Sequence, residues 1–402
     1  MKSKFVLTTL FTFLFYHLSF AQTAYTVIPD PNFEKALSRY DDISEDGKVP
    51  TAMIKLVKEL HITSAPVKDL SGLEAFEALE VFSCNFTKVR ELDVSNNTKL
   101  KKLEFVVGKL ESIDISNNLD LQELNCNGNM ISDLDVSLNS KLKKLSINGN
   151  RIKVLDITNN SLLQELDCGD NIIEDLDVSK NTKLINLGVS GNPLGTLNIS
   201  KNWKLEIVSC VSNQLTTLDI SKNKQLRWLA CQNNELEILD LSNNPELSNV
   251  ICSSNNLRSV DATSFGLVSN LERFIATENP SLECIKVNNA SAAENKVGQY
   301  ELWFKDDTTT YSENCNVLSI ADFTTNSEIK FYPNPSSGVF HIAGAIMVDT
   351  IKIFSTNGSL IRTIDGANSS VKKVDLSGFT KGIYFLQTTH QKKSFFNKVS
   401  IQ

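Results

Sequence analysis

Histidine, glycine and proline are scarce in this sequence, with four His, 17 Gly and 9 Pro among 402 residues. So little glycine and proline excludes collagen-like and low-complexity classes, and 41% hydrophobic residues are enough to bury a core. Only His61, His341 and His390 follow the first 22 residues, so the middle of the chain has no imidazole base for a serine or cysteine nucleophile. Gly-rich phosphate loops and the H-E-x-x-H and C-x-x-C motifs are also absent. We therefore expect neither catalytic residues nor a cofactor, with an enzyme as a distant alternative.

The chain also lacks an excess of positive charge. It has 40 Lys and Arg against 47 Asp and Glu, a net charge of -7 that disfavours a nucleic acid partner. The charge is unevenly placed: residues 329–402 carry nine basic and three acidic residues (+6), whereas residues 22–328 carry 29 basic and 44 acidic residues (-15). This contrast indicates two parts of different character, joined near residue 328.

Long apolar runs are missing except at the start. The segment from Phe5 to Phe20 is apolar, follows Lys2 and Lys4, and is shorter than the roughly 20 residues that span a membrane. Small residues Ser19 and Ala21 then occupy the positions that signal peptidase accepts. Residues 1–21 are therefore predicted to be a signal peptide cleaved between Ala21 and Gln22, and no transmembrane helix is expected.

A repeat of 21 residues fills the middle of the sequence. Its pattern is L-x-x-L-x-[Cys or apolar]-x-x-N-x-[apolar]-x-x-L-D-[V/I/L]-S-x-N, and a tenth copy begins at Leu271 after three extra residues. The first leucines of the nine preceding copies are Leu79, Leu100, Leu121, Leu142, Leu163, Leu184, Leu205, Leu226 and Leu247.

One such unit cannot bury its own apolar face. Alternating L-x-L positions predict short strands, and stacking the units in parallel at ~4.8 Å would create a continuous hydrophobic column. The connections are too short for a full helix in each coil. The asparagines Asn129, Asn150, Asn171, Asn192, Asn213, Asn234 and Asn255 are expected to form a ladder whose amides satisfy the backbone groups exposed where each strand bends.

These residues resemble leucine-rich repeats, in particular the bacterial 21-residue class with nested repeats and cysteine in the third apolar slot. The resemblance implies a mainly β fold, a leucine-rich repeat solenoid with parallel β ladders and a cap at each end. We expect an N-terminal cap at 22–78, because Ile28 to Phe33 is similar to such caps and places Phe33 and Leu37 on one helical face. The repeats, about ten coils, would occupy 79–283, followed by a C-terminal disulfide cap at 284–318 and a linker at 319–328.

Six of the eight cysteines share one phase of the repeat, and the corresponding residues of intervening copies are Phe105, Ile147 and Val189. The slot therefore favours apolar volume over a tetrahedral zinc site, although oxidation of thiols on successive coils stays open. The remaining Cys284 and Cys315 lie outside this phase and, in a secreted chain, suggest a disulfide. The six cysteines in phase are Cys84, Cys126, Cys168, Cys210, Cys231 and Cys252.

Aspartates recur after the asparagine turn in all copies but one, in which Asn198 takes their place. Their mutual repulsion is offset in one of two ways: by hydrogen bonds from nearby serines together with lysines such as Lys141, or by weak divalent-cation sites. We favour the first and expect no metal, and Asp135, Asp156 and Asp177 are the weak metal candidates of the second.

Polar residues flank the cysteine slot and should point outward from the strands. They contain no aromatic residue, which suits a protein or glycan on another cell or in the matrix that is contacted at many weak points. A structural surface rod without a specific ligand is the nearer alternative. The candidate partner-binding residues are Asn125, Asn127, Ser146, Asn148, Asp167, Ser190 and Gln232.

The last part of the chain, residues 329–402, has its own pattern. Tyr332-Pro333-Asn334-Pro335 precedes a predicted strand, Asn357-Gly358 is a hairpin signal, and the short strands are typical of a small β-sandwich. These motifs resemble the C-terminal sorting domain of the bacterial type IX secretion system. The resemblance implies contact with that machinery and export by a Gram-negative bacterium. The protein would then be secreted or anchored to the outer surface, with signal peptide and sorting domain removed.

Overall fold

The computed structural model describes residues 24–63, 66–263, 273–315, 330–343, 350–355, 360–365, 373–390 and 393–402. The predicted signal peptide, the linker at 319–328 and Leu271 lie outside the described residues. The chain divides between Leu162 and Leu163 into two compact units, and each is described by itself. No helix among the described residues has the length and apolar character needed to cross a membrane.

The N-terminal end of the first unit is a small cap of mixed structure. Strand β1 (Tyr25–Val27) pairs antiparallel with β2 (Lys48–Pro50), and the helices are α1 (Pro31–Ala36), η1 (Ser38–Tyr40) and α2 (Thr51–Ile54). Phe33 and Leu37 are fully buried, as their helical spacing predicts. The helix α1 begins at Pro31 because the Asp30 carboxylate accepts hydrogen bonds from the backbone N–H groups of Asn32 and Phe33.

Asp30 also joins α1 to residues 68 and 69 of the same chain. Its second carboxylate oxygen accepts hydrogen bonds from the N–H groups of Lys68 (2.7 Å) and Asp69 (3.2 Å). Burial alone would raise the pKa of Asp30, but these four backbone donors outweigh it and hold the pKa below its usual value. The ionised carboxylate is therefore part of the folded cap.

We expect Asp30→Ala to lower the free energy of unfolding by about 1–3 kcal/mol at pH 7, because α1 loses its cap and two further N–H groups lose their acceptor. Because the pKa of Asp30 is depressed, its carboxylate stabilises the folded state at a pH above the unfolded pKa of about 3.9. This stabilisation is lost as the pH falls through the folded pKa. Urea melts between pH 7 and pH 3 should therefore show a smaller acid-induced loss in the variant. The exposed Asp46→Ala serves as control, and an equal acid-induced loss in Asp30→Ala would contradict the assignment.

The repeats of the first unit build two parallel ladders. The main one joins β3 (Glu59–Thr63), β4 (Val81–Asn85), β6 (Lys102–Glu104), β8 (Glu123–Asn125) and β9 (Lys144–Ser146). A second ladder pairs β5 (Glu91–Asp93) with β7 (Ser112–Asp114), and η2 (Leu73–Ala75) precedes the first coil. From β4 to β9 partners lie 21 residues apart, for example Leu103 and Leu124, so each of these coils repeats the register of its neighbour, whereas partners on β3 and β4 lie 22 apart.

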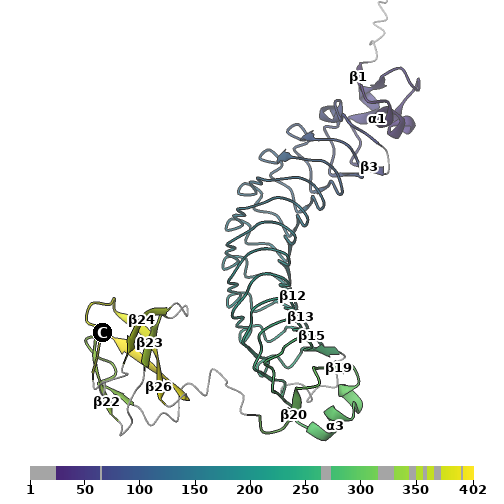
Figure 1. Cartoon of the computed structure of the whole chain (residues 1–402). Coiled ribbons are helices and arrows are strands. Elements are labelled where there is room, and N and C mark those ends of the chain that lie inside the picture. Colours follow the sequence, from purple (N-terminus) through teal and green to yellow (C-terminus); the bar gives the residue numbers. More distant parts are fainter. Residues whose placement is uncertain are drawn as a thin grey trace, which may run out of the picture. The chain divides into compact units, whose positions relative to one another are not determined.

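The second unit contains the same two kinds of parallel ladder. Its main sheet joins β10 (Glu165–Asp167), β11 (Asn186–Gly188), β12 (Ile207–Ser209), β13 (Trp228–Ala230), β15 (Asn249–Ile251), β17 (Arg273–Ile275) and β19 (Trp303–Phe304). Its second ladder is β14 (Ile238–Asp240), β16 (Ser259–Asp261), β18 (Cys284–Lys286) and β20 (Thr310–Ser312), with α3 (Ala290–Glu294) and η3 (Gly298–Tyr300) beside its end. Figure 1 shows β12, β13 and β15 on consecutive coils.

A column of buried leucines forms the core of both units. The central residue of the three-residue strands in the coils is buried, as Leu124 and Leu187 are, and in these two strands the residues on either side are half-exposed. The repeat leucines from Leu79 to Leu247 are at most 2% exposed. The coils contain no α-helix within residues 79–263, as their short connections predict. The fold is therefore the expected mainly β, parallel solenoid.

The asparagine ladder closes each coil from within. Asn234 is buried, and its amide nitrogen donates to the carbonyl oxygens of Cys210 and Cys231 while its amide oxygen accepts from the N–H groups of Asn213 and Leu215. A second, more deeply buried ladder accompanies it. In seven of its members Nδ2 donates to two backbone carbonyls, 24 and 21 residues earlier, as that of Asn244 does to Ile220 and Asn223. These seven are Asn97, Asn118, Asn139, Asn160, Asn202, Asn223 and Asn244.

Two turns of the first unit, at Phe86 and Val107, depart from the glycine pattern of their neighbours. Gly128 and Gly149 have φ of 68° and 67°, whereas Val107 occupies the equivalent position with φ 54° because the glycine of that copy falls one residue later, at Gly108. A β-branched residue is strained in this left-handed conformation. The Val107 side chain is 49% exposed, so little packing compensates the strain.

We therefore expect Val107→Gly to raise the free energy of unfolding by about 1 kcal/mol, because relief of the left-handed strain outweighs the chain entropy that glycine adds to the unfolded state. Chemical denaturation measures the change. Lys109→Gly, two residues later at an exposed position without positive φ, should instead be neutral or destabilising. A destabilised Val107→Gly would show that the exposed valine packs more than its strain costs.

The C-terminal part of the second unit is a pair of antiparallel sheets. One contains β21 (Lys330–Tyr332), β22 (Val339–Ala343) and β25 (Lys373–Asp375), and the other contains β23 (Thr350–Phe354), β24 (Leu360–Asp365), β26 (Gly382–His390) and β27 (Lys393–Ile401). Both sheets contribute to one buried cluster, Phe340 and Val374 from the first and Ile351, Ile353 and Leu386 from the second. This packing fits the expected small β domain (Figure 1).

Candidate functional site

The outward side of the main parallel sheet is the face on which most of the predicted partner-binding residues lie. Asn125 and Ser146 are the last residues of β8 and β9. Both are half-exposed, and each directly follows a buried leucine. Asn127 and Asn148 follow two residues later in the same coils. In the second unit, Asp167 ends β10, while Ser190 and Gln232 follow β11 and β13. We call this side of the sheet, in both units, the outward sheet face.

Many polar groups on this face already have partners within the chain. The Asn127 amide oxygen accepts a hydrogen bond from the Asn148 N–H at 2.7 Å, and that of Asn125 accepts from the Asn127 N–H. Ser190 and Ser209 bond through their hydroxyl groups at 2.9 Å. These contacts stabilise neighbouring coils and leave fewer groups for a ligand than the sequence alone indicates.

Charged residues occupy the face in the first unit. Lys102, at the start of β6, lies 3.8 Å from Glu104 and 3.6 Å from Glu123 of the next strand. Opposite charges therefore alternate across neighbouring strands and compensate one another. Lys102 and Glu123 take first strand positions, on the other side of the central leucine from the predicted partner-binding residues.

Apolar and aromatic residues occupy the face toward the end of the second unit. Trp228 of β13 is 38% exposed, Ile207 of β12 is 43% exposed and Phe304 of β19 is 40% exposed. Ile251 and Ile275 are half-exposed beside them. The expectation that the outward sheet face lacks aromatic residues is therefore wrong. Trp228 was missed because it takes the first strand position of its coil, on the other side of the central leucine from the residues considered.

The aspartates that follow the asparagine turns are held by local hydrogen bonds. Asp135 and Asp156 accept from the backbone N–H two residues later, at 2.8 and 2.9 Å, and Asp177 does the same at 2.8 Å. Hydrogen bonds from Ser137 and Thr158 lower the pKa of Asp135 and Asp156. The predicted serine contacts are present. Lys141, however, pairs with Asp120 and not with a ladder aspartate.

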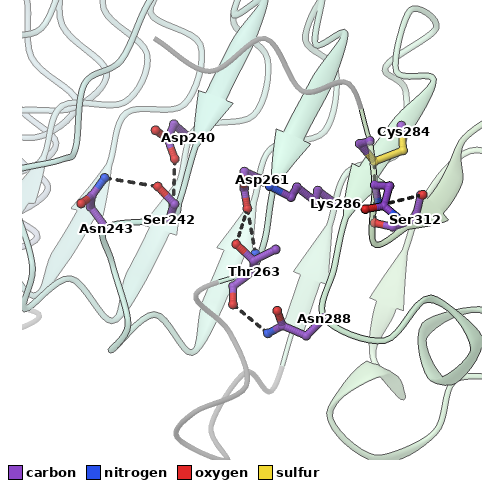
Figure 2. Close-up of polar contacts among 11 residues, drawn as sticks. Asp240, Ser242, Asn243, Asp261, Thr263, Cys284, Lys286, Asn288 and Ser312 are labelled. Carbon is purple, nitrogen blue, oxygen red and sulfur yellow. Dashed lines mark hydrogen bonds and ion pairs between the residues drawn. A yellow bond between two sulfur atoms is a disulfide. The ribbon is translucent and has the colours of Figure 1, made fainter. Parts of the chain in front are cut away.

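The ladder ends at the C-terminal cap, where a lysine replaces the aspartate. Asp240, Asp261 and Lys286 are in register on β14, β16 and β18, and Lys286 Nζ lies 3.3 Å from the Asp261 carboxylate. Figure 2 shows this ion pair beside the Asp240–Ser242 and Asp261–Thr263 hydrogen bonds. In the described part of the chain, no group of three or more His, Cys, Asp or Glu side chains is arranged to hold a metal ion.

The cysteines separate into the two expected classes. Cys284 of β18 and Cys315 form a disulfide, whereas the six cysteines of the repeat phase are free and buried. Burial raises the pKa of the Cys126 and Cys210 thiols to about 12, so these thiols stay protonated at neutral pH. A protonated, buried thiol is a poor nucleophile and a poor metal ligand, and the ladder acts as apolar filling.

A cavity of about 660 Å³ lies between the cap and the first coils of the first unit. Its charges balance, and its lining has no histidine or cysteine to act as base or nucleophile. The charged residues that line it are Lys68, Asp69, Glu74, Lys88, Arg90, Glu91, Asp93 and Lys109.

Comparison with known proteins identifies the two parts of the chain. Residues 330–402 match the family model of the secretion system C-terminal sorting domain. The end of the chain is a sorting domain. The matched range begins at residue 330, one residue after the start of the 329–402 segment that the sequence motifs delimit. A search of curated proteins found no match.

Solved structures match much of the chain in fold. The functional domain of InlJ from Listeria monocytogenes, described as including a cysteine ladder, is 19% identical with a TM-score of 0.57, covering 94% of this chain and 98% of that one. A chain of the octameric complex of Latrophilin 3, Unc5D and the leucine-rich repeats of FLRT2 is 19% identical with a TM-score of 0.50, covering 65% of this chain and 90% of that one. The protein is therefore a leucine-rich repeat solenoid that carries a sorting domain.

Proposed function

We propose that this protein is a non-enzymatic interaction module, exported by the type IX secretion system and displayed on or released from the surface of a Gram-negative cell. In this proposal the solenoid binds a protein partner through the outward sheet face. The sorting domain directs export and is removed afterwards, together with the signal peptide. The partner would be a protein of another cell or of the surrounding matrix.

The observation that carries the binding role is the exposure of large apolar side chains on an otherwise regular sheet. A rod that binds nothing has no need to expose Trp228 and Phe304 on the same face, whereas contiguous exposed apolar residues are typical of interaction sites. The structural neighbour described as a complex of Latrophilin 3, Unc5D and FLRT2 shows that solenoids of this kind can assemble with proteins. The charge-balanced cavity and the protonated buried thiols support a non-enzymatic role.

The export part of the proposal is tested by truncation. A chain ended at residue 328 keeps the solenoid and loses the sorting domain, so it should accumulate in the periplasm while the full chain reaches the surface or the medium. Immunoblots of periplasmic, membrane and medium fractions measure this. A second chain with Phe340→Ala, which disrupts the buried cluster of the sorting domain, should behave like the truncation. Normal export of the truncated chain would contradict the proposal.

A structural rod remains the second candidate, and the compensated charges of the first unit favour it for that part of the sheet. The two candidates differ in one measurable respect: a rod without a ligand tolerates substitutions across the outward sheet face. Loss of cell adhesion or of partner capture by a Trp228→Ala variant that is exported and folded would favour the binding module.

A further inference from the structure

Five exposed or half-exposed apolar residues lie on the outward sheet face of the second unit in two registered rows. Ile207 and Trp228 take first strand positions, and Ile251, Ile275 and Phe304 take last strand positions. Ile207 is in register with Trp228, Ile251 with Ile275, and Ile275 with Phe304. Neighbouring strands are about 4.8 Å apart, so registered side chains touch or nearly touch. Ala230, in register with Ile251, connects the Trp228 side of the patch to the isoleucines. We call these five residues the apolar patch.

The patch has a positive border. Arg227 directly precedes Trp228, and Arg273 begins β17 in register with Asn249; both are exposed. Neither guanidinium forms an ion pair with any residue that the structure describes. Lys296 Nζ lies 4.8 Å from the centre of the Phe304 ring at the end of the sheet.

The nearby carboxylates are mostly occupied. Asp306 accepts hydrogen bonds from the N–H groups of Glu278 and Asn279, and Glu278 in turn bonds the Ser254 hydroxyl at 2.5 Å. Glu206, half-buried, directly precedes β12. Among these charged groups, Arg227 and Arg273 have no ion-pair partner in the described residues and can pair with carboxylates of a ligand, although residues 22–328 as a whole carry -15.

From this arrangement we propose that the apolar patch binds a segment of a partner protein with apolar anchor residues and flanking Asp or Glu. This deepens the proposed function and rests on it. Trp228 and the isoleucines bury the anchors, and Arg227 and Arg273 pair with the flanking carboxylates. A glycan fits less well, because three isoleucines offer no hydrogen bonds to hydroxyl groups. A second copy of this chain docked patch to patch would set arginines against arginines.

The test uses the chain from residue 22 to 402, immobilised, and a phage-displayed library of random dodecapeptides as probe. Selected peptides should combine aromatic or aliphatic residues with Asp or Glu. The tightest is synthesised with a fluorescent label, and its Kd is measured by polarisation. Trp228→Ala should weaken binding at least about tenfold, as loss of a central anchor does, and Arg227→Glu with Arg273→Glu should do the same.

Trp203→Ala is the matched control, because Trp203 is 52% exposed but lies in a turn outside the sheet, and it should leave the Kd unchanged. Circular dichroism melts verify that each variant folds. The inference is overturned if no peptide is enriched, if the enriched peptides are basic, or if Trp228→Ala binds as tightly as the original chain. If peptide binding is lost only when Lys102 or Glu123 is substituted, the inference about the apolar patch is overturned, while the proposed function is supported. A dimer in sedimentation that Trp228→Ala dissociates would instead assign the patch to self-association.

Discussion

Asn234→Ala is expected to lower the free energy of unfolding by about 4 kcal/mol. The substitution removes the amide that pairs the Cys210 carbonyl at 2.8 Å and the N–H groups of Asn213 and Leu215 at 3.0 Å each. All three partners belong to buried residues, and an unpaired buried polar group costs about 1–3 kcal/mol. Water can replace part of the loss only by entering the coil, because Asn234 itself is 8% exposed.

Urea denaturation followed by circular dichroism measures this change. Asn243→Ala is the control: Asn243 is exposed, its amide bonds only the Ser242 hydroxyl at 3.2 Å, and its loss should change stability by less than about 0.5 kcal/mol (Figure 2). Because each coil contacts only its neighbours, the variant should also broaden the unfolding transition, since the coils before and after Asn234 can then unfold separately. Equal stability of the two variants would show that the asparagine ladder is not needed to close the coils.

Much of this fold was predictable from periodicity alone. A leucine at each 21-residue step must lie at the same place in every coil, so Leu121 and Leu142 identify the inward positions without knowledge of their partners. The amide ladder was predictable as well, because the bends of parallel coils expose backbone groups that asparagine can satisfy. The disulfide followed from two cysteines that share no phase with the rest.

The outward sheet face was less predictable, for a physical reason. Inward positions are constrained by packing, so their residue types repeat, whereas outward positions are free to vary from coil to coil. Consecutive first strand positions hold Lys102, Glu123 and Lys144 in the first unit but Ile207 and Trp228 in the second. Averaging the coils into one consensus removes this variation, and with it the difference between a charge-compensated surface and an apolar one. The individual coils had to be compared in register.

The second ladder of buried asparagines was also hidden by its context. Asn139 and Asn244 belong to the S-x-N segment of the repeat. This segment follows the aspartates and has the polar composition of a solvated turn. Both residues are in fact fully buried. Their Nδ2 groups reach backbone carbonyls one coil earlier, a contact between residues more than 20 positions apart that no local pattern specifies. Only the stacking of coils makes this turn part of the core.

The C-terminal end of the solenoid should depend on the disulfide more than on any single packed residue. Cys284 begins β18, and Cys315 follows β20, the last strand of the second ladder. Around them Trp303, 1% exposed, packs against Phe274 and Tyr300 and covers the final coil. Closing a loop with a sequence separation of 31 residues contributes about 3–4 kcal/mol in the chain-entropy description.

Cys284→Ser is therefore expected to lower the free energy of unfolding by about 3–4 kcal/mol, and the double substitution with Cys315→Ser should lower it by no more, since one change already opens the loop. Cys126→Val is the control for losing a thiol, because Val189 fills the same slot in another coil. Hydrogen exchange should rise first in β16, β18 and β20, since a solenoid unravels from its weakest end and distant coils keep their neighbours. Faster exchange spread evenly from β4 to β20 would contradict a cap that acts locally, and would show instead that the solenoid unfolds as one cooperative body.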